Sequence, residues 1–517
     1  MSKNIYKVAG VVMLSALYTP VISAQGYSPA SIEVLKEQRL WAQSTNAAGA
    51  ILDNTRNYSL VNIGYDNSDG NFHRPQSGES VNNAGVVCEG FMDLQTALVW
   101  GEFSFKQRNI NGSQFNASIA DPFRGMPYFY ADEHKSDWRN QNYDMKFRAS
   151  TPLYWGHLAI GVEGVYRAAI AAKQLDPRVD TRYFELGLTP GLVYAINPSH
   201  SVGADFQYMA IKEDSRMENI NLTVPQTYYM LYGLGMAGKL IGDGNRTDYH
   251  GHILGGGLQY NFRTGGFNAM LTGDYSRRVE NVDNNPTVPE KKAAVKEDAY
   301  SVGLRMRYSG DRWANHLDLA TTINDISGIQ YLNEYNNSED CPGWDVVNYN
   351  IRSTYKTTSL SADYSLIRYR EDEYAWRLDA GVKYHRQRDS YILPEARKNY
   401  DGVYAHLTGK YNFKLGESMN RRLLVSASVG VMSAGNGEYI YSDAMPDYPT
   451  ISVLETNDIK YLSSDYWNIG GSATYSQQLK GANRMNCYVR AEINYIKTNS
   501  YDFSHRRHMA FAVGFTF

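Results

Sequence analysis

Two histidines, His250 and His252, have the most suggestive spacing in the sequence, because residues two apart lie on the same side of a β-strand. Two imidazoles placed this way could ligate a metal or a haem-like group. However, Leu254 and Leu258 continue the same alternation, which assigns both histidines to the apolar, outward side of the strand, at its rim. The pattern therefore favours a polar rim over a metal site.

Five further histidines fall on the polar side of strand-like segments, namely His157, His316, His385, His406 and His508. None of them sits in a local Ser, Asp or Asn pattern of the kind found in outer-membrane phospholipases or proteases. The sequence also has no phosphate loop, metal-finger spacing or nucleotide fingerprint. We predict no catalytic, cofactor-binding or metal-binding residue, and we expect no enzyme.

Charged residues recur at alternate positions of several segments, opposite an apolar face. The set comprises Arg148, Glu163, Arg305, Arg307, Arg377, Asp379, Lys383, Arg490 and Glu492. If these segments form the wall of a barrel, both signs of charge line the lumen. The residues could then border a polar conduit, or they could pair across strands and fill the interior.

Composition limits the class of protein that can position these groups. The 517 residues carry 51 Lys plus Arg and 54 Asp plus Glu, so the net charge is -3, and mean hydropathy is -0.48. Beyond the extreme N-terminus no apolar run reaches the roughly 18 residues of a membrane helix. The balanced charge gives no basic surface for nucleic acid. With 42 Tyr, 17 Phe and 8 Trp, the chain suits a large β-structure.

Strand-like alternation runs through most of the chain. Residues 376–387 and 486–495 put apolar side chains on one face and charged or amide side chains on the other. Residues 509–517 alternate large apolar with small residues and end on Phe517. Many such segments exceed ten residues, whereas strands of water-soluble proteins average about five or six. The length favours a membrane barrel over a two-layer sandwich.

The links between these segments alternate between short and long. The longest cover residues 107–141, 212–247, 325–347 and 433–462, and the links on either side of them are a few residues. Outer-membrane barrels show this asymmetry between periplasmic turns and external loops. Taking residues 57–75 as a first strand with a bulge, we predict an all-β, antiparallel up-and-down barrel of 18 strands, with 16 as the alternative.

The N-terminal residues divide into two regions before the barrel, which we place at residues 56–517. Residues 1–24 have two lysines, a short apolar stretch and a small pair at the end, as in a cleavable secretory signal. Residues 25–55 begin with a helical pattern that follows Ser28 and Pro29. We favour a short periplasmic helix and linker for this region, and the alternative is a plug inside the lumen.

One predicted external loop is unusually apolar. Residues 228–236 read Tyr-Tyr-Met-Leu-Tyr-Gly-Leu-Gly-Met, where a solvated loop should be polar. The segment could fold into the barrel mouth, pack against a partner or bind an apolar ligand. We favour constriction of the mouth by packing.

The last strand resembles the C-terminal strand of bacterial outer-membrane proteins, through Phe511, Val513, Phe515 and Phe517. The resemblance implies that these residues form a signal read by the barrel assembly machinery. Residues 46–50 are also similar to the N-terminal hatch of fatty-acid-transporter-like barrels.

More widely, residues 40–49, 72–76 and 100–105 resemble a family of uncharacterised Bacteroidota outer-membrane barrels that we associate with gene neighbourhoods of TonB-dependent receptors. This resemblance implies an outer-membrane location and a barrel fold. It supplies no activity and no site residues.

We therefore expect a porin-like transport barrel in the outer membrane of a Gram-negative bacterium, either a pore or an accessory to nutrient uptake. A docking barrel that holds a partner through its external loops is the alternative, and an outer-membrane enzyme is the least favoured reading. Expected partners are outer-membrane lipid and the barrel assembly machinery, with a TonB-dependent receptor or a surface lipoprotein as a further candidate. No cofactor and no nucleic acid are expected.

Overall fold

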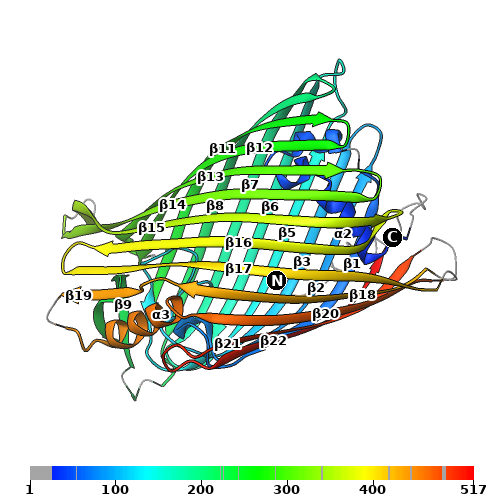
Figure 1. Cartoon of the computed structure of the whole chain (residues 1–517). Helices are drawn as coiled ribbons and strands as arrows, with labels where there is room; N and C mark the ends of the chain where they lie inside the picture. The colour runs from blue at the N-terminus through cyan, green and yellow to red at the C-terminus, as the bar shows by residue number, and fades with distance from the viewer. Residues whose placement is uncertain are drawn as a thin grey trace.

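The chain forms a closed antiparallel β-barrel of 18 strands, as counted over the residues that the structure describes (Figure 1). This structure is a computed structural model, and it describes residues 26–53, 55–221, 223–224, 226–242, 244–285, 287–338, 342–416, 420–442, 445–479 and 485–517. The predicted signal at residues 1–24 lies outside this range. None of the helices in the described ranges has the length and apolarity needed to cross a membrane.

The barrel strands follow one another in chain order. They are β1 (Tyr58–Asp69), β2 (Ser80–Asp93), β3 (Leu98–Ser113), β5 (Ser136–Ser150), β6 (Leu158–Lys173), β7 (Arg178–Asn197), β8 (His200–Glu218), β11 (Gly244–Thr264), β12 (Phe267–Asn284), β13 (Glu290–Ser309), β14 (Trp313–Asn336), β15 (Gly343–Arg370), β16 (Glu373–Tyr391), β17 (Glu395–Gly416), β18 (Arg421–Ala434), β20 (Tyr466–Gln478), β21 (Asn486–Thr498) and β22 (His505–Thr516).

Smaller elements lie before the barrel and in its connections. They are α2 (Pro29–Glu37), η1 (Trp41–Gln43), η2 (Ala47–Asp53), η3 (Pro75–Ser77), β4 (Tyr130–Ala131), β9 (Gln226–Gly233), β10 (Met236–Gly242), β19 (Glu438–Ser442), η4 (Thr450–Glu455) and α3 (Thr456–Leu462). Strands β4, β9 and β10 make a separate three-stranded sheet, and β19 pairs with the start of β17.

The last strand closes the barrel. β22 pairs with β21 on one side and with β1 on the other, and Phe517 N donates to Ser59 O at 2.9 Å. Closure leaves no sheet edge along the wall, which matters because lipid cannot hydrogen-bond an exposed edge. The predicted count of 18 strands is confirmed. The predicted extent of the first strand is wrong, since β1 ends at Asp69 with no bulge in its pairing to β2, and Pro75 begins η3.

The two ends of the barrel differ. At one end, here called the turn end, strands join through connections such as residues 94–97, 198–199 and 265–266, and β1 begins and β22 ends there. At the other, here called the loop end, long connections at residues 114–135, 219–243 and 435–465 carry the smaller elements.

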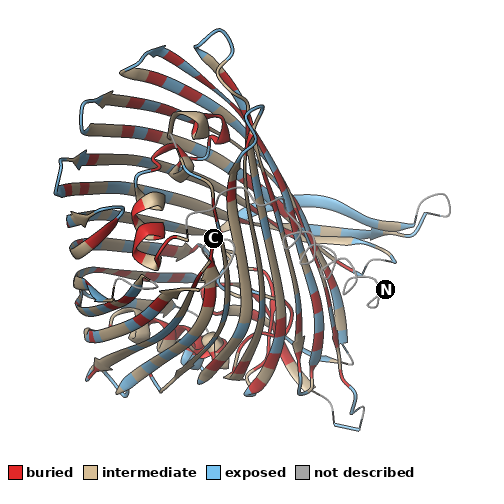
Figure 2. Cartoon of the chain, turned by 90° about the vertical axis from the view of Figure 1, so that its right-hand side faces the viewer, coloured by how far each residue is buried: buried red, intermediate tan, exposed pale blue. Residues whose placement is uncertain are grey.

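Burial alternates along the wall because successive side chains point to opposite faces. In β7 nearly every second residue is buried and its neighbours are exposed. Figure 2 shows such alternating bands of buried and exposed residues along the strands of the wall. The outward face carries large apolar side chains, such as Leu258, Val302 and Phe511, with exposed fractions of 69%, 54% and 52%. An uncovered apolar belt of this kind is typical of a surface that contacts lipid.

Strands β14 and β15 continue beyond their neighbours. β13 pairs with β14 only as far as Gln330, and β16 pairs with β15 only from Ser353. Residues 331–338 and 342–352 therefore form a two-stranded ribbon beyond the wall, mostly exposed, seen as the pale-blue hairpin that projects at the right of Figure 2. The sequence pattern had placed residues 325–347 in a loop, so this part of the prediction is wrong.

Candidate functional site

Residues 26–53, here called the plug, occupy the turn end of the barrel (Figure 1). Its helix α2 begins with Pro29 in the first turn, and the Ser28 side chain caps it by accepting from Ser31 N at 3.1 Å. Leu40 and Trp41 are fully buried, together with Val193 and Met270 of the barrel wall. The segment therefore packs against the inward face of the barrel wall.

The wall bonds several backbone carbonyls of the plug. Arg148 donates to Ala42 O at 2.6 Å and to Ser44 O at 3.0 Å, and Ser150 Oγ donates to Ala48 O at 2.9 Å. On another strand, Arg263 Nη2 donates to Leu52 O at 2.7 Å. These bonds satisfy plug carbonyls that would otherwise be buried without partners.

The wall is also shaped to admit the plug. A Cβ added at Gly161 would overlap the backbone of Ala48, and a Cβ added at Gly191 would overlap the side chain of Asn46. Asn46 Nδ2 in turn donates to Leu192 O at 2.9 Å. Any larger side chain at these two wall positions would therefore displace the plug.

An ionic cluster fixes the end of α2. Glu37 contacts Arg377, which also bonds Asp379 at 2.6 Å, and His316 Nδ1 lies 3.4 Å from Glu37. Burial alone would raise the pKa of Glu37, but the hydrogen bond from His316 and the charge of Arg377 lower it to about 2. Nearby, Arg307 Nε donates to Glu37 O at 3.2 Å and its Nη1 donates to Asp318 at 2.5 Å.

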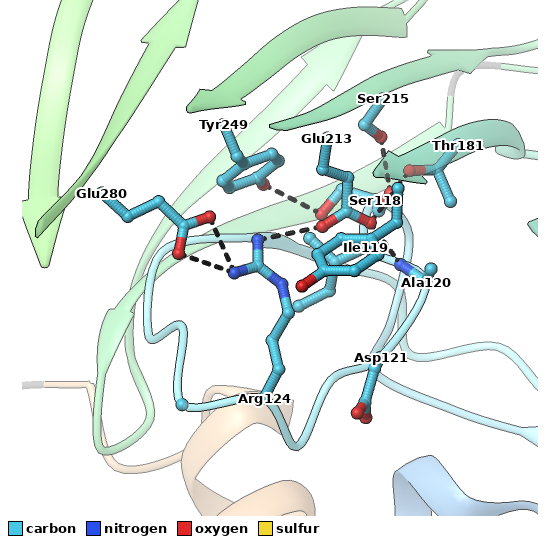
Figure 3. Close-up of polar contacts among 12 residues, drawn as sticks. Ser118, Ile119, Ala120, Asp121, Arg124, Thr181, Glu213, Ser215, Tyr249 and Glu280 are labelled. Carbon is cyan, nitrogen blue, oxygen red and sulfur yellow. Dashed lines mark hydrogen bonds and ion pairs between the residues drawn. The ribbon is translucent and has the colours of Figure 1, made fainter. Parts of the chain in front are cut away.

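At the loop end, residues 114–135 fold inward and are held by a buried arginine (Figure 3). Arg124 lies 2.9 Å from Glu213 and 2.7 Å from Glu280, and both glutamate side chains are fully buried. Glu213 also accepts from Ala120 N at 2.6 Å and from Thr181 Oγ1 at 3.1 Å. The loop and the wall thus share one charged network, and the two carboxylates raise the pKa of Arg124 further above its usual value, although burial opposes this.

The apolar segment at residues 228–236 packs into the same end. Tyr228, Tyr229, Met230 and Leu231 are each about 95% buried, and Met230 pairs with Tyr130 of the inward loop. They share an apolar cluster with residues from several wall strands. The segment therefore packs within the chain itself, against the inward loop and the wall.

A second charged cluster joins the loops at residues 70–79 and 435–465. Lys398 lies 2.6 Å from Glu455 and 3.1 Å from Asp458, and Arg74 lies 2.5 Å from Asp458. Burial raises the pKa of Asp458, but the positive charges of Lys398 and Arg74 outweigh it and leave the pKa below its usual range. The sequence gives no signal for these pairs, because their members are far apart in the chain.

The charged residues that the sequence assigns to the lumen fall into three groups. Arg148, Arg307 and Arg377 contact the plug, and Glu163 and Asp379 pair with the first and the last of these. Arg490 and Glu492 pair with each other at 3.0 Å. Arg305 is partly buried near Asp318 and Asp274, and Lys383 is exposed, with no side-chain bond to a described residue. Pairing and plug contacts therefore account for seven of the nine.

The histidines do not form a metal centre or a triad. Within the described part of the chain no group of three or more His, Cys, Asp or Glu could hold a metal. His252 stacks on outward-facing Tyr208, and His250 is exposed. His385 contacts Ser359 and His508 contacts Ser68, each at 2.9 Å, but no described carboxylate hydrogen-bonds the other ring nitrogen.

Comparisons with known proteins add to this description. Among solved structures the chain is similar to BauA, the ferric preacinetobactin receptor from Acinetobacter baumannii, with 9% identity, coverage of 89% of this chain and 80% of that chain, and a TM-score of 0.42. It is similar to the copper transporter OprC, with 11% identity, coverage of 89% and 80%, and a TM-score of 0.41. It is also similar to a FadL homologue from Pseudomonas aeruginosa, with 12% identity, coverage of 92% and 93%, and a TM-score of 0.34.

No curated protein matches the chain. A family model matches residues 47–517, which is most of the chain. The chain therefore belongs to DUF6850, a family of unknown function.

Proposed function

We propose that this protein is an outer-membrane transport barrel for a small polar solute, gated by the plug at the turn end and by the inward loops at the loop end. The apolar belt on the outward face and the closed sheet support a location in the outer membrane. The polar side chains along the inward face, such as Asp205, Asn324 and Ser361, support passage of a polar rather than an apolar solute.

One observation carries the proposal, namely that polar contacts which water or a solute can replace hold much of the plug to the wall, beside the apolar contacts of Leu40 and Trp41. Glycines at positions 161 and 191 make room for the plug, and polar wall side chains bond its carbonyls. Water or a solute can replace hydrogen bonds and ion pairs of this kind more readily than an interlocked apolar core. The arrangement therefore suits a segment that moves.

Conductance of the purified protein in planar bilayers tests the gate. Deleting residues 27–53 should give a permanently open pore. In a background with Cys88, Cys341 and Cys487 changed to Ser, we would add Thr45→Cys and Asp205→Cys, because these side chains are hydrogen-bonded at 2.8 Å. The oxidised pair should abolish openings, and reduction should restore them.

The single variant Thr45→Cys is the matched control and should respond to neither oxidation nor reduction. If the deleted protein folds but conducts no ions, or if the oxidised pair conducts like the reduced one, the plug is a permanent filler. The docking barrel would then be the better proposal. For such a role, the exposed ribbon at residues 331–338 and 342–352 is the surface that a surface lipoprotein or a TonB-dependent receptor could contact.

We further propose that the barrel assembly machinery reads the strand ending at Phe517 and that the protein carries no catalytic site. The first proposal is supported by the place of β22 at the closure of the barrel. The second is supported by the side-chain pairings of the inward histidines described above.

A further inference from the structure

A pocket of about 390 Å³ lies at the turn end, where the last residues of the plug meet three turns of the wall. The turns are those between β5 and β6, β7 and β8, and β11 and β12. The residues that bear on its chemistry are Leu52 of the plug and His157, Asn197, Ser201, Asn261 and Arg263 of the wall. The volume is within the usual range for a small-molecule site, at its lower end.

Arg263 is the main charge of the pocket. Its Nη2 donates to Leu52 O, and its remaining donors have no acceptor among the described residues. A guanidinium presents five donors, and its planar fork fits the two oxygens of a carboxylate or phosphate. Arg263 therefore retains donors for a further acceptor.

Two neighbouring groups are also incompletely bonded. Ser201 lines the pocket and is only 5% exposed, yet its hydroxyl has no partner in the described part of the chain. The hydroxyl oxygen is not enclosed by protein, so it opens to the pocket and is available to a ligand or to water. His157 donates from Nδ1 to Ala195 O at 2.6 Å, and it is exposed at the rim of the pocket, where its ring stacks on Tyr194.

The pocket has no acidic lining. None of its twelve described lining residues is Asp or Glu. The nearby carboxylate of Asp53 is occupied by the backbone, since it accepts from Trp41 N at 3.0 Å and from Ala42 N at 2.8 Å. An incoming anion would therefore meet Arg263 with no competing carboxylate in the pocket wall.

From this geometry we infer that the pocket binds an oxyanion, the phosphate or carboxylate of a small molecule or of a lipid headgroup. The anion accepts from the free donors of Arg263 and from the hydroxyl of Ser201. Because Arg263 also holds Leu52 O, the bound anion sits against the end of the plug. The inference concerns binding alone and does not depend on whether the barrel conducts.

The test is calorimetric titration of the full-length protein, in a non-ionic detergent, with inorganic phosphate and separately with succinate. We expect saturable binding of at least one anion. Arg263→Gln should weaken it about tenfold or more, because a charge-assisted hydrogen bond is lost. Ser201→Ala should weaken it by a smaller factor. The matched control is Arg312→Gln, which changes an exposed arginine on a turn at the same end and should bind like the parent.

Nanodiscs separate the two sources of the anion. If a lipid headgroup is the natural occupant, phosphatidylglycerol nanodiscs should block phosphate binding and phosphatidylcholine nanodiscs should not. If a soluble molecule is the occupant, both nanodiscs should allow it. The inference is overturned if neither anion binds saturably, or if Arg263→Gln and Ser201→Ala both bind as tightly as the parent. Ser201→Ala preserves the plug contact of Arg263, so it keeps the test valid if Arg263→Gln disturbs folding.

Discussion

Arg124 is the residue on which the inward position of the loop at residues 114–135 depends. Its removal would leave Glu213 buried without a counter-charge and Glu280 with Arg278 as its remaining partner, and loss of one partner from a buried ion pair destabilises by about 3 to 5 kcal/mol. The loop can avoid that penalty by leaving the wall. We therefore predict that Arg124→Met releases the loop while the barrel stays folded.

Limited proteolysis of the folded protein would show this release as new cleavage within residues 114–135. Arg182→Ala is the control, because Arg182 is 70% exposed and its pair with Asp180 spans 3.2 Å at the surface, where such pairs contribute little. Equal protection of the loop in the parent and in Arg124→Met would show that the other contacts of the loop, such as the bonds from Arg278 to Gly125 O and from Ser215 to Ser118 O, are enough to hold it.

The stability of the folded plug should depend on pH through Asp53. Burial raises the pKa of Asp53 to about 6 from its usual 3.8, although hydrogen bonds from Trp41 N and Ala42 N oppose the shift. The folded plug thus holds a proton more tightly than the unfolded segment does. The stabilisation is fully present below about pH 4 and is lost as the pH rises through 6.

The measurement is the rate at which a thiol reagent labels Ser44→Cys, divided by the rate in the same protein carrying Asp53→Asn. The division removes the intrinsic pH dependence of the thiol. We predict that this ratio of labelling rates rises between pH 4 and pH 7. Asp53 ionises in this range and destabilises the folded plug, whereas the asparagine that replaces it cannot ionise. A flat ratio would mean that Asp53 does not control the closure of the plug.

For single residues, the sequence predicts which face of a strand a side chain lies on better than it predicts which residue that side chain contacts. Alternation is enough to assign Arg148 and Arg377 to the polar face of their strands. It cannot show that one bonds the carbonyl of Ala42 and the other Glu37, because these partners lie about 106 and 340 positions away in the chain. Partners at such separations are set by the closure of the barrel.

Among the elements, strand registers follow from the local pattern, and a paired test can check one of them. Ile493 of β21 points outward and is 51% exposed, whereas its neighbour Asn494 points inward. If Ile493 lies near the centre of the lipid layer, Ile493→Arg should destabilise the barrel by about 2 to 4 kcal/mol, and Asn494→Arg should have little effect. Urea unfolding in lipid vesicles measures both, and equal losses would contradict the assignment of the two faces.

Element boundaries were harder to predict than faces, and the ribbon shows why. Polar and apolar residues still alternate within residues 325–347, but Asn, Asp and Gly interrupt them, which favours a loop on composition. In the structure Tyr335 pairs with Trp344 and Tyr331 with Tyr349 across the two strands. Such cross-strand aromatic contacts stabilise a hairpin, and they depend on a pairing that composition does not reveal.

For the whole molecule, the number of strands could be predicted because it depends on the alternation of short and long links, which is a local property. The state of the lumen could not. Whether residues 26–53 lie inside depends on recesses at Gly161 and Gly191, and single glycines in strands carry no signal of what they face. The helical pattern of the segment would be the same in a periplasmic helix and in a plug inside the lumen.

The last strand, β22, closes the barrel by pairing with the first strand, β1. Deleting residues 515–517 removes the pairs Val61↔Phe515 and Leu60↔Thr516 and the bonds between Phe517 and Ser59. The end of β1 would then present unpaired backbone groups to the membrane, where each costs several kcal/mol. We predict that the truncated chain is exported but fails to reach the outer membrane as a folded barrel.

Fractionation of cells, combined with heat-dependent mobility on gels, measures whether the truncated chain reaches the outer membrane folded. A chain with residues 27–29 deleted instead is the control, because it loses the contact of Tyr27 O with Thr516 Oγ1 but no strand pairing. Truncated protein that is heat-modifiable in the outer membrane at the parent level would show that closure tolerates the loss of these three residues and that assembly does not depend on Phe517.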